Sequence, residues 1–120
     1  MAQNITIDNV EIRKRYYKSG ALWWETPYVN GKKHGIEKFF YRSGTLERVT
    51  PYVNGKKHGT DEWFYESGAL WVEIPYVTGR IHGIAKHYDK DNTNIDCLIL
   101  YNRNCRVSTL CLESYRGSSM

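Results

Sequence analysis

Short segments rich in aromatic and β-branched residues alternate along this chain with polar turn signals. Residues 22–28 (LWWETPY) and 36–41 (IEKFFY) are two such segments, and both have the length of a strand. Ser19-Gly20 precedes the first segment, and Asn30-Gly31 separates the two. These pairs tolerate positive φ and close hairpins, and glycine at each end would break a helix. The pattern therefore predicts one hairpin per unit, continued as an antiparallel meander.

The unit repeats with a period of 24 residues. The nonapeptide PYVNGKKHG occupies residues 27–35 and again 51–59, and it returns in eroded form as PYVTGRIHG at 75–83. A fixed period of this size indicates one supersecondary unit stacked on copies of itself. We therefore expect an all-β fold, a single-layer antiparallel β-meander of about eight strands. It would be built from 24-residue hairpin repeats with atypical terminal strands.

The ends of the chain are degenerate copies of the same unit. We expect a single repeat domain over residues 1–120, with an N-terminal cap at 1–11, regular repeats at 12–88 and a degenerate C-terminal cap at 89–116. Residues 95–101 resemble the strand that ends in the repeat tyrosine, shifted by one insertion, and residues 107–112 could form a final strand. Such atypical ends are expected because a terminal unit must cover an edge that the others bury.

Several side chains recur in register and predict ladders across the sheet. Tyr28, Tyr52 and Tyr76 are one such set, and each cross-strand aromatic pair contributes about 0.2–1 kcal/mol. We interpret these ladders as packing. The proline before each tyrosine removes a ladder donor, so we expect it at a strand end or a bulge. Glu25 and Glu73 also recur, and we interpret them as cross-strand partners of lysine.

Other aromatic positions change from repeat to repeat. Trp23 and Trp71 correspond to Glu47 in the middle repeat, and Phe39 corresponds to Trp63. A position that accepts tryptophan in one repeat and glutamate in the next is not expected in a core. We therefore predict a partner-binding surface on an exposed apolar face, formed by Trp23, Trp71, Phe39 and Trp63. The alternative is that these rings pack beneath a terminal strand or loop.

The second candidate site is cationic. Basic residues recur in the same turn of successive hairpins, namely Lys32, Lys33, Lys56, Lys57 and Arg80. Turns two strands apart lie about 9.6 Å from each other, so these residues would form a row along one rim. Such a row could meet an acidic protein surface, nucleic acid phosphates or anionic lipid head groups. The alternative is that turn lysines are simply solvated, since one ordinary turn copied three times produces a row.

Composition limits the compartment and the class of protein. The formal net charge is +4 and aromatic residues make up 14% of the chain, which suits an aromatic-rich β structure. No apolar run approaches the roughly 20 residues of a membrane span, and no signal peptide is visible. Without a signal peptide, the odd number of cysteines (Cys97, Cys105 and Cys111) favours free thiols in a reducing compartment. We therefore expect a cytoplasmic protein.

Neither catalysis nor metal binding is indicated by the motifs. The chain has no nucleophile elbow, phosphate loop or zinc-protease motif, so we expect no enzyme and no cofactor. His34, His58 and His82 recur with the period, but a column spaced by about 9.6 Å cannot place its members on one ion. We therefore predict no metal site and expect each turn histidine to bond to neighbouring backbone.

The repeat motif resembles a known family. The pattern Tyr-x-x-Gly-Lys-x-His-Gly-x-x-x-x-(Phe/Tyr)-Tyr-x-x-Gly-x-Leu looks like the MORN repeat, and it is closest to the bacterial variant found in YwqK-family antitoxins. The resemblance covers residues 12–88 and rests on Tyr28, Asn30, Gly31, Lys32, His34, Gly35, Tyr41, Gly44 and Leu46 with their copies. It implies a twisted antiparallel meander that binds protein or lipid. The antitoxin likeness implies a cytosolic protein that neutralises a partner.

Two functional hypotheses follow from these patterns. The first is a non-enzymatic module that occupies the functional surface of a protein partner, as an antitoxin or a phage-encoded inhibitor of a host defence system would. The second is an anionic-ligand module, in which the Lys/His turn row meets phosphates of lipid or nucleic acid. Binding to phosphates should weaken steeply with salt, whereas an aromatic-centred protein interface should not. The sequence identifies neither the partner nor the oligomeric state.

The predicted turns can be tested at a single glycine. We expect Gly31, Gly55 and Gly79 to adopt positive φ, because Asn-Gly hairpins require it. Replacing Gly55 by Val should therefore lower the free energy of unfolding by about 1 kcal/mol or more. Thermal denaturation followed by circular dichroism measures the change, and an unaltered melting temperature would contradict the assigned turn.

Overall fold

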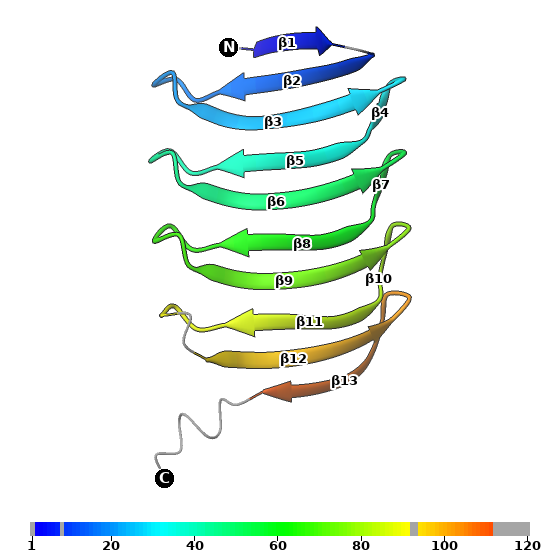
Figure 1. Ribbon diagram of the computed structural model, residues 1–120. Helices are drawn as coiled ribbons and strands as arrows, with labels where there is room; N and C mark the ends of the chain where they lie inside the picture. The colour runs from blue at the N-terminus through cyan, green and yellow to red at the C-terminus, as the bar shows by residue number, and fades with distance from the viewer. Residues whose placement is uncertain (1, 8, 92–93, 112–120) are drawn as a thin grey trace.

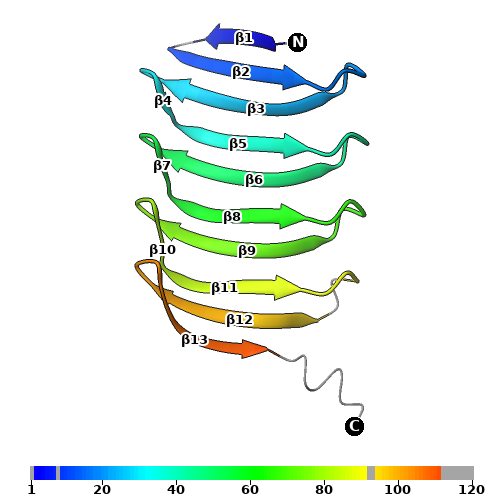
Figure 2. The same ribbon diagram turned by 180° about the vertical axis from the view of Figure 1, so that it is seen from behind.

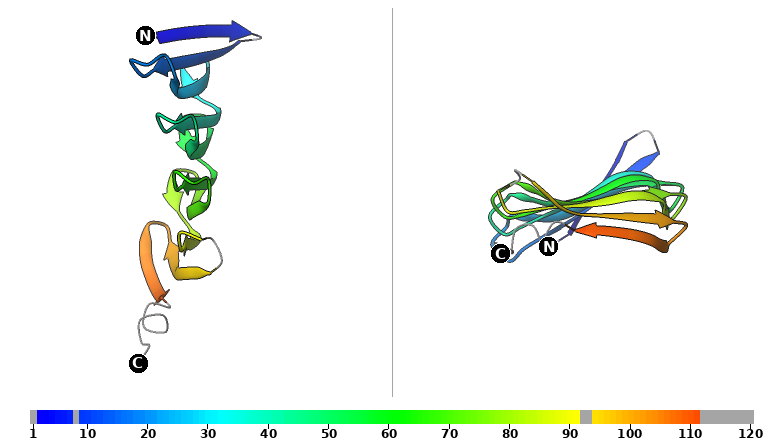
Figure 3. Two further views of the ribbon diagram at one scale, coloured as in Figure 1. Left: turned by 90° about the vertical axis from the view of Figure 1, so that its left-hand side faces the viewer. Right: turned by 90° about the horizontal axis from the view of Figure 1, so that it is seen from below.

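The chain folds as one open antiparallel sheet. A computed structural model describes residues 2–7, 9–91 and 94–111, and within them every regular element is a strand. The strands follow one another across the sheet in chain order, as Figures 1 and 2 show from its two sides. The molecule measures 56 × 35 × 17 Å, and the side view in Figure 3 shows a single layer. The predicted single-layer meander is confirmed.

The strand number exceeds the expected eight. The main path consists of β1 (Ala2–Ile7), β2 (Val10–Tyr16), β3 (Leu22–Val29), β5 (Gly35–Phe40), β6 (Leu46–Val53), β8 (Gly59–Phe64), β9 (Leu70–Val77), β11 (Gly83–Tyr88), β12 (Ile95–Asn102) and β13 (Cys105–Cys111). Three two-residue strands lie beside it: β4 (Lys32–Lys33), β7 (Lys56–Lys57) and β10 (Arg80–Ile81). Sequence analysis missed β1 because its segment carries no copy of the repeat motif. The predicted strands at 95–101 and from 107 are present as β12 and β13, whereas residue 112 lies outside the described residues.

The repeat prolines lie inside strands rather than at a strand end or bulge, so that expectation was wrong. Pro27 belongs to β3 and faces the break between β4 and β5, where its carbonyl accepts the N–H of His34 at 3.1 Å. Proline has no N–H, but its nitrogen faces the same break as its carbonyl, so no hydrogen bond of the ladder is lost. The break requires glycine for two reasons. Gly35 has a φ of +114°, and a Cβ at this position would lie 3.0 Å from the Pro27 ring. The Pro-Gly pairs of the next two repeats, Pro51 with Gly59 and Pro75 with Gly83, repeat this arrangement.

Successive hairpins are tied together at both ends of their strands. At the Asn-Gly turns, Nδ1 of His34 accepts the N–H of Asn54 at 3.1 Å, and the N–H of Gly55 bonds to the carbonyl of Lys33 at 2.7 Å. The turn histidine thus bonds to backbone as expected, but to the backbone of the next hairpin. At the Ser-Gly turns, the hydroxyl of Tyr17 donates to the carbonyl of Phe40 at 2.6 Å. Both ties recur in the following repeats.

The turns and the tyrosine ladder have the predicted geometry. Gly31, Gly55 and Gly79 have φ values of 79°, 85° and 85°, which confirms the expected left-handed conformation. Tyr28 and Tyr52 pair with the second lysine of their turns, Tyr76 pairs with Ile81, and all three tyrosines occupy the same register position of their strands. They therefore point to one face of the sheet.

The two faces of the sheet differ in character. We call the side that carries Thr26, Thr50 and the tyrosine ladder the threonine face, and the side that carries Pro27 and Pro51 the proline face. Pairing partners share a face. Near the Ser-Gly turns, each repeat inserts one extra residue into the ladder, so that Trp24 pairs with Arg15 and Leu22 with Tyr16 while Trp23 is bulged.

Two of the three cysteines are joined, which corrects the expectation of free thiols. Cys97 and Cys111 lie opposite each other on β12 and β13 and form a disulfide, whereas Cys105 is a free, exposed thiol. The pairing depends on the register between two irregular strands, which a count of cysteines does not reveal. The described residues contain no helix able to span a membrane.

The tyrosine ties between repeats can be tested by removing one oxygen. Tyr41→Phe deletes the bond from the Tyr41 hydroxyl to the Phe64 carbonyl, which measures 2.6 Å. We expect the free energy of unfolding to fall by about 0.5–1.5 kcal/mol, because the carbonyl loses its donor while the ring stays in place. Urea denaturation measures the loss. Tyr17→Phe and Tyr65→Phe should behave alike, and three unaltered variants would show that these bonds do not hold the repeats together.

Candidate functional site

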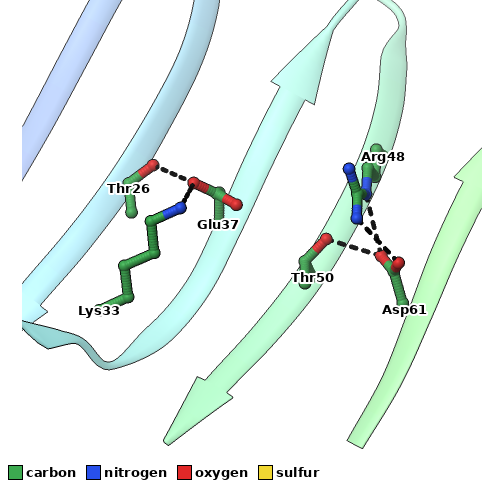
Figure 4. A network of polar contacts seen from close by, with 6 residues as sticks. All are labelled: Thr26, Lys33, Glu37, Arg48, Thr50 and Asp61. Carbon is green, nitrogen blue, oxygen red and sulfur yellow. Dashed lines mark hydrogen bonds and ion pairs between the residues drawn. The ribbon is translucent and has the colours of Figure 1, made fainter. Parts of the chain in front are cut away.

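Polar side chains, rather than apolar ones, form the most buried part of the threonine face. Thr50 is 0% exposed, and Asp61 and Thr26 are each 1% exposed. The Thr26 hydroxyl donates to Oε2 of Glu37 at 2.7 Å, and the Thr50 hydroxyl donates to Oδ1 of Asp61 at 2.6 Å. Figure 4 shows these two threonine–carboxylate pairs side by side. We call Thr26, Glu37, Thr50 and Asp61 the buried row.

A cation neutralises each carboxylate of the buried row, but it comes from a different place in each repeat. Lys33, from the turn strand β4, donates to Oε2 of Glu37 at 2.9 Å. Arg48, from β6, makes two bonds to Asp61 at 3.2 and 3.1 Å (Figure 4). Aspartate is one carbon shorter than glutamate, and it is held by the arginine on the neighbouring strand. Every buried charge in this row therefore has a partner, as burial requires.

The difference in partners gives the two turn lysines different properties. Burial alone would lower the pKa of Lys33, but the hydrogen bond and charge of Glu37 outweigh burial and raise it. Burial also lowers the pKa of Lys57, and the positive charge of Arg48 lowers it further. Among the described residues, no carboxylate lies within ion-pair distance of Lys57. Its ammonium group lies instead over the ring of Tyr76, 4.8 Å from the centroid.

An aromatic and cationic row runs beside the buried row. Trp24 pairs with Phe39, Phe39 with Arg48, and Arg48 with Trp63. The guanidinium of Arg48 lies 4.4 Å from the Trp63 ring centroid and 5.9 Å from that of Phe39. The indole N–H of Trp63 donates to Asp61 at 3.2 Å, so the ring and the arginine share one carboxylate.

The structure brings three of the four predicted aromatic residues into one cluster. Trp71 meets Trp63 edge-on, with ring centroids 6.4 Å apart, so that Phe39, Arg48, Trp63 and Trp71 form what we call the Arg48 cluster. Trp23 lies in a separate group with Trp24, its centroid 6.4 Å away. Trp23 and Trp71 are 42% and 40% exposed, whereas Phe39 and Trp63 are half-buried.

The exposed tryptophans are bulge residues, which explains why their position varies. In the first three repeats the inserted residue is Trp23, Glu47 and Trp71 in turn. A bulged side chain does not have to fit a cross-strand neighbour, so tryptophan and glutamate are both accepted there. Sequence comparison between repeats detected this variation but not the bulge behind it. Arg48, which links the predicted aromatic residues, was not predicted as a site residue.

The predicted basic rim is divided between the two faces. Lys33 and Lys57 pair with tyrosines and lie half-buried on the threonine face. The other three basic residues, Lys32, Lys56 and Arg80, pair with valines and lie exposed on the proline face. The rim is therefore two rows of different character rather than one.

A shallow cavity lies at the rim and is lined by residues of the second, third and fourth turns. It has a volume of about 410 Å³, and its lining includes Lys56, Arg80, His82 and Arg103. Arg103 was missed because the C-terminal cap was treated as degenerate. The alignment of Tyr101 with the repeat tyrosines would have placed Arg103 and Asn104 in a fourth turn, where both have positive φ. Among the described residues, no three histidine, cysteine or acidic side chains gather as metal ligands.

Comparison with known families supports the repeat. Residues 33–54 and 57–78 each match a family model described as a MORN repeat variant. No curated protein matches the chain. MORN repeats are typically binding modules, and the matches are compatible with a non-enzymatic binding role. They do not support the narrower likeness to YwqK-family antitoxins.

The chain contains its own control for the buried charges. In the third repeat Val72, Ile74 and Ala85 stand where the second repeat has Arg48, Thr50 and Asp61, and Val72 and Ala85 are the buried hydrophobic residues of the described sheet. The third repeat thus has an apolar triplet at the positions where the second repeat has a polar one, and both repeats have the same fold.

This internal control leads to a prediction about coupled substitutions. Asp61→Asn leaves Arg48 without its counter-charge and should lower the free energy of unfolding by about 3 kcal/mol. The triple variant Arg48→Val, Thr50→Ile, Asp61→Ala copies the third repeat and should be as stable as the natural chain or more so. Chemical denaturation of both variants measures the difference. A triple variant less stable than Asp61→Asn would show that the polar triplet is required at this site.

Proposed function

We propose that this chain is a non-enzymatic module that binds a protein partner through the threonine face and thereby blocks the partner's functional surface. The Arg48 cluster and Trp23 would form the contact. The observation that supports this most is the exposed bulge residue Trp71 next to Trp63, whose ring lies against an arginine held by a buried carboxylate. Trp23 is exposed at the same bulge position of the first repeat. Tryptophan, tyrosine and arginine are the residues that most often dominate protein interfaces.

Preorganisation strengthens this proposal. Arg48 is fixed by two bonds to Asp61 and lies against the ring of Trp63, so little side-chain freedom remains to be lost on binding. Trp71 contacts both Trp63 and Tyr65, at centroid distances of 6.4 and 5.4 Å. A partner would meet a surface whose large side chains already hold their positions.

The exposed basic residues have a supporting role in this proposal. Lys32, Lys56 and Arg80 lie at the rim, outside the aromatic clusters, and would attract an acidic partner and speed its association. The proposal also includes the kind of partner, a toxin or a host defence factor that this chain would inhibit, and a cytoplasmic location. In a reducing compartment Cys97 and Cys111 would face each other as thiols.

A second candidate is an anionic-ligand module, and the rim cavity is the observation that favours it. Lys56, Arg80 and Arg103 all contribute to its lining. Phosphates of a lipid head group or of a nucleic acid would suit three cations in one hollow. The cavity is open and lies away from the exposed tryptophans, so the two candidates make different residues essential.

Binding of a partner distinguishes the candidates. The partner is captured from lysate on the immobilised chain, identified and purified, and then titrated by calorimetry against variants. Trp23→Ala with Trp71→Ala should weaken binding by a factor of about 30 or more, because central aromatic residues contribute about 2 kcal/mol or more on truncation. Ile84→Ala changes an exposed residue of the proline face that does not line the rim cavity; it is the matched control and should bind normally. Circular dichroism confirms that each variant folds.

The rim variant completes the test. Lys32→Gln, Lys56→Gln and Arg80→Gln together should slow association and leave dissociation almost unchanged if the rim only attracts the partner. Loss of binding in the rim variant, with normal binding by the tryptophan variant, would favour the anionic-ligand candidate instead. Vesicles with anionic lipid and a short nucleic acid duplex then serve as probes for the two sources of phosphate. Trp63→Ala is not used, because Trp63 also bonds to Asp61 and its loss would disturb the fold.

A further inference from the structure

Within residues 2–7, 9–91 and 94–111 no layer covers the proline face, yet most of the exposed apolar side chains lie there. Of the nine large apolar side chains that are exposed in the described part of the chain, six point to this face: Ile36, Val53, Val77, Ile84, Leu100 and Leu110. Figure 3 shows that no element of the sheet packs over either side. Ile84 and Leu100 are direct cross-strand neighbours, and exposed apolar side chains that adjoin each other mark interaction surfaces.

A row of charges runs across the same face, next to the apolar side chains. In order across the sheet it contains Lys14, Glu25, Lys38, Val49, Glu62, Glu73 and Lys86, each paired with the next. The row is polarised. Its first three residues, two lysines and a glutamate, carry a net charge of +1, and its last three, two glutamates and a lysine, carry −1.

One local conflict lies within the charged row. Glu62 and Glu73 are directly opposite each other on β8 and β9, a like-charge pairing that destabilises a sheet. Burial raises the pKa of Glu62, and the charges of Glu73 and Asp61 raise it further. Glu73 also accepts a bond from the Tyr88 hydroxyl at 2.6 Å, and Lys86 lies opposite it on β11. A further cation over Glu73 would relieve the repulsion.

We propose that a second copy of this chain covers the proline face, related by a two-fold axis that runs along the strands between β6 and β8. Rotation about this axis reverses the order of the strands in the second copy. Each row of side chains that runs across the strands then lies opposite the same row of the other copy. The axis lies at the middle of the sheet, since β6 is the fifth and β8 the sixth of ten strands along the main path. The positive half of each charged row then meets the negative half of the other.

The symmetry defines the contacts. Lys38 on β5 of one copy faces Glu73 on β9 of the other, and Glu25 on β3 faces Lys86 on β11. In the apolar row the same operation places Ile36 against Pro75. Two twisted sheets packed face to face cross at about −30°, so pairs close to the axis are displaced least. The Lys38–Glu73 pair is the closer of the two charge pairs.

The size of the face is sufficient for a stable dimer. The molecule measures 56 Å by 35 Å in its two longer dimensions, and an interface of standard size buries about 800 Å² per partner. The threonine face, with its exposed tryptophans, stays outside this contact. The dimer therefore leaves the proposed tryptophan contacts open. Lys32, Lys56 and Arg80 lie at the rim of the covered face, where the same operation brings the basic turns of the two copies near each other.

Charge reversal followed by mixing tests the proposal. Analytical ultracentrifugation of the full chain, over a range of concentrations, should show a dimer. In a dimer of the Lys38→Glu variant, the new glutamate of each copy faces Glu73 of the other, which gives two Glu–Glu contacts. A dimer of the Glu73→Lys variant has two Lys–Lys contacts in the same places. Each variant alone should raise the dimer dissociation constant at least about tenfold. An equimolar mixture of the two should restore dimers, because both contacts become attractive again in the mixed pair.

Controls and alternative outcomes complete the design. Lys18→Glu makes the same charge change in an exposed Ser-Gly turn and should leave the dimer intact. If Glu73→Lys does not fold because the Tyr88 bond is lost, Lys86→Glu mixed with Glu25→Lys takes its place. A natural chain that stays monomeric at every soluble concentration overturns the proposal and leaves the face to a different protein. A dimer that withstands the charge reversals, or variants that do not recover on mixing, overturns this geometry.

Discussion

A single-layer sheet has no second layer to pack against, and the rest of this structure depends on how that constraint is met. Each hairpin is instead hydrogen-bonded to the next hairpin within the sheet at both ends of its strands, through a histidine at one end and a tyrosine at the other. These bonds explain why the motif keeps a histidine and a tyrosine in every regular repeat. They hold neighbouring turns at a fixed spacing, and the glycine after each histidine provides the kink that brings the turn within reach.

The same constraint explains a polar interior. Without an opposing layer, the centre of the threonine face is covered only by long side chains from its own strands. Arg48 lies over Trp63 and Lys33 over Tyr52, so aliphatic stems and rings exclude water from the threonines between them. Carboxylates then neutralise the cations that provide this cover. The apolar third repeat shows that the arrangement is one solution among at least two.

The sequence predicted the parts of the structure that depend on local chemistry. The Asn-Gly turns, the register of Tyr28 with its copies and the open meander all follow from residues within one repeat. What the sequence did not predict depends on partners across strands. Glu37 and Asp61 recur with the period, and that signal could have been noticed, but the change of partner from Lys33 to Arg48 depends on a strand spacing that the sequence does not show. The Cys97–Cys111 pairing was missed for the same reason.

The bulge separates recognition from stability in this fold. Residues in the rows must match their neighbours, so a change at Asp61 requires matching changes at Arg48 and Thr50. The bulged residue has no such requirement, and the first three repeats place Trp23, Glu47 and Trp71 there without altering the strands around them. Positions two strands apart lie about 9.6 Å from each other. The sheet can therefore present a line of side chains at a fixed interval, and substitutions along that line would change what the surface binds while the lateral bonds continue to hold the fold.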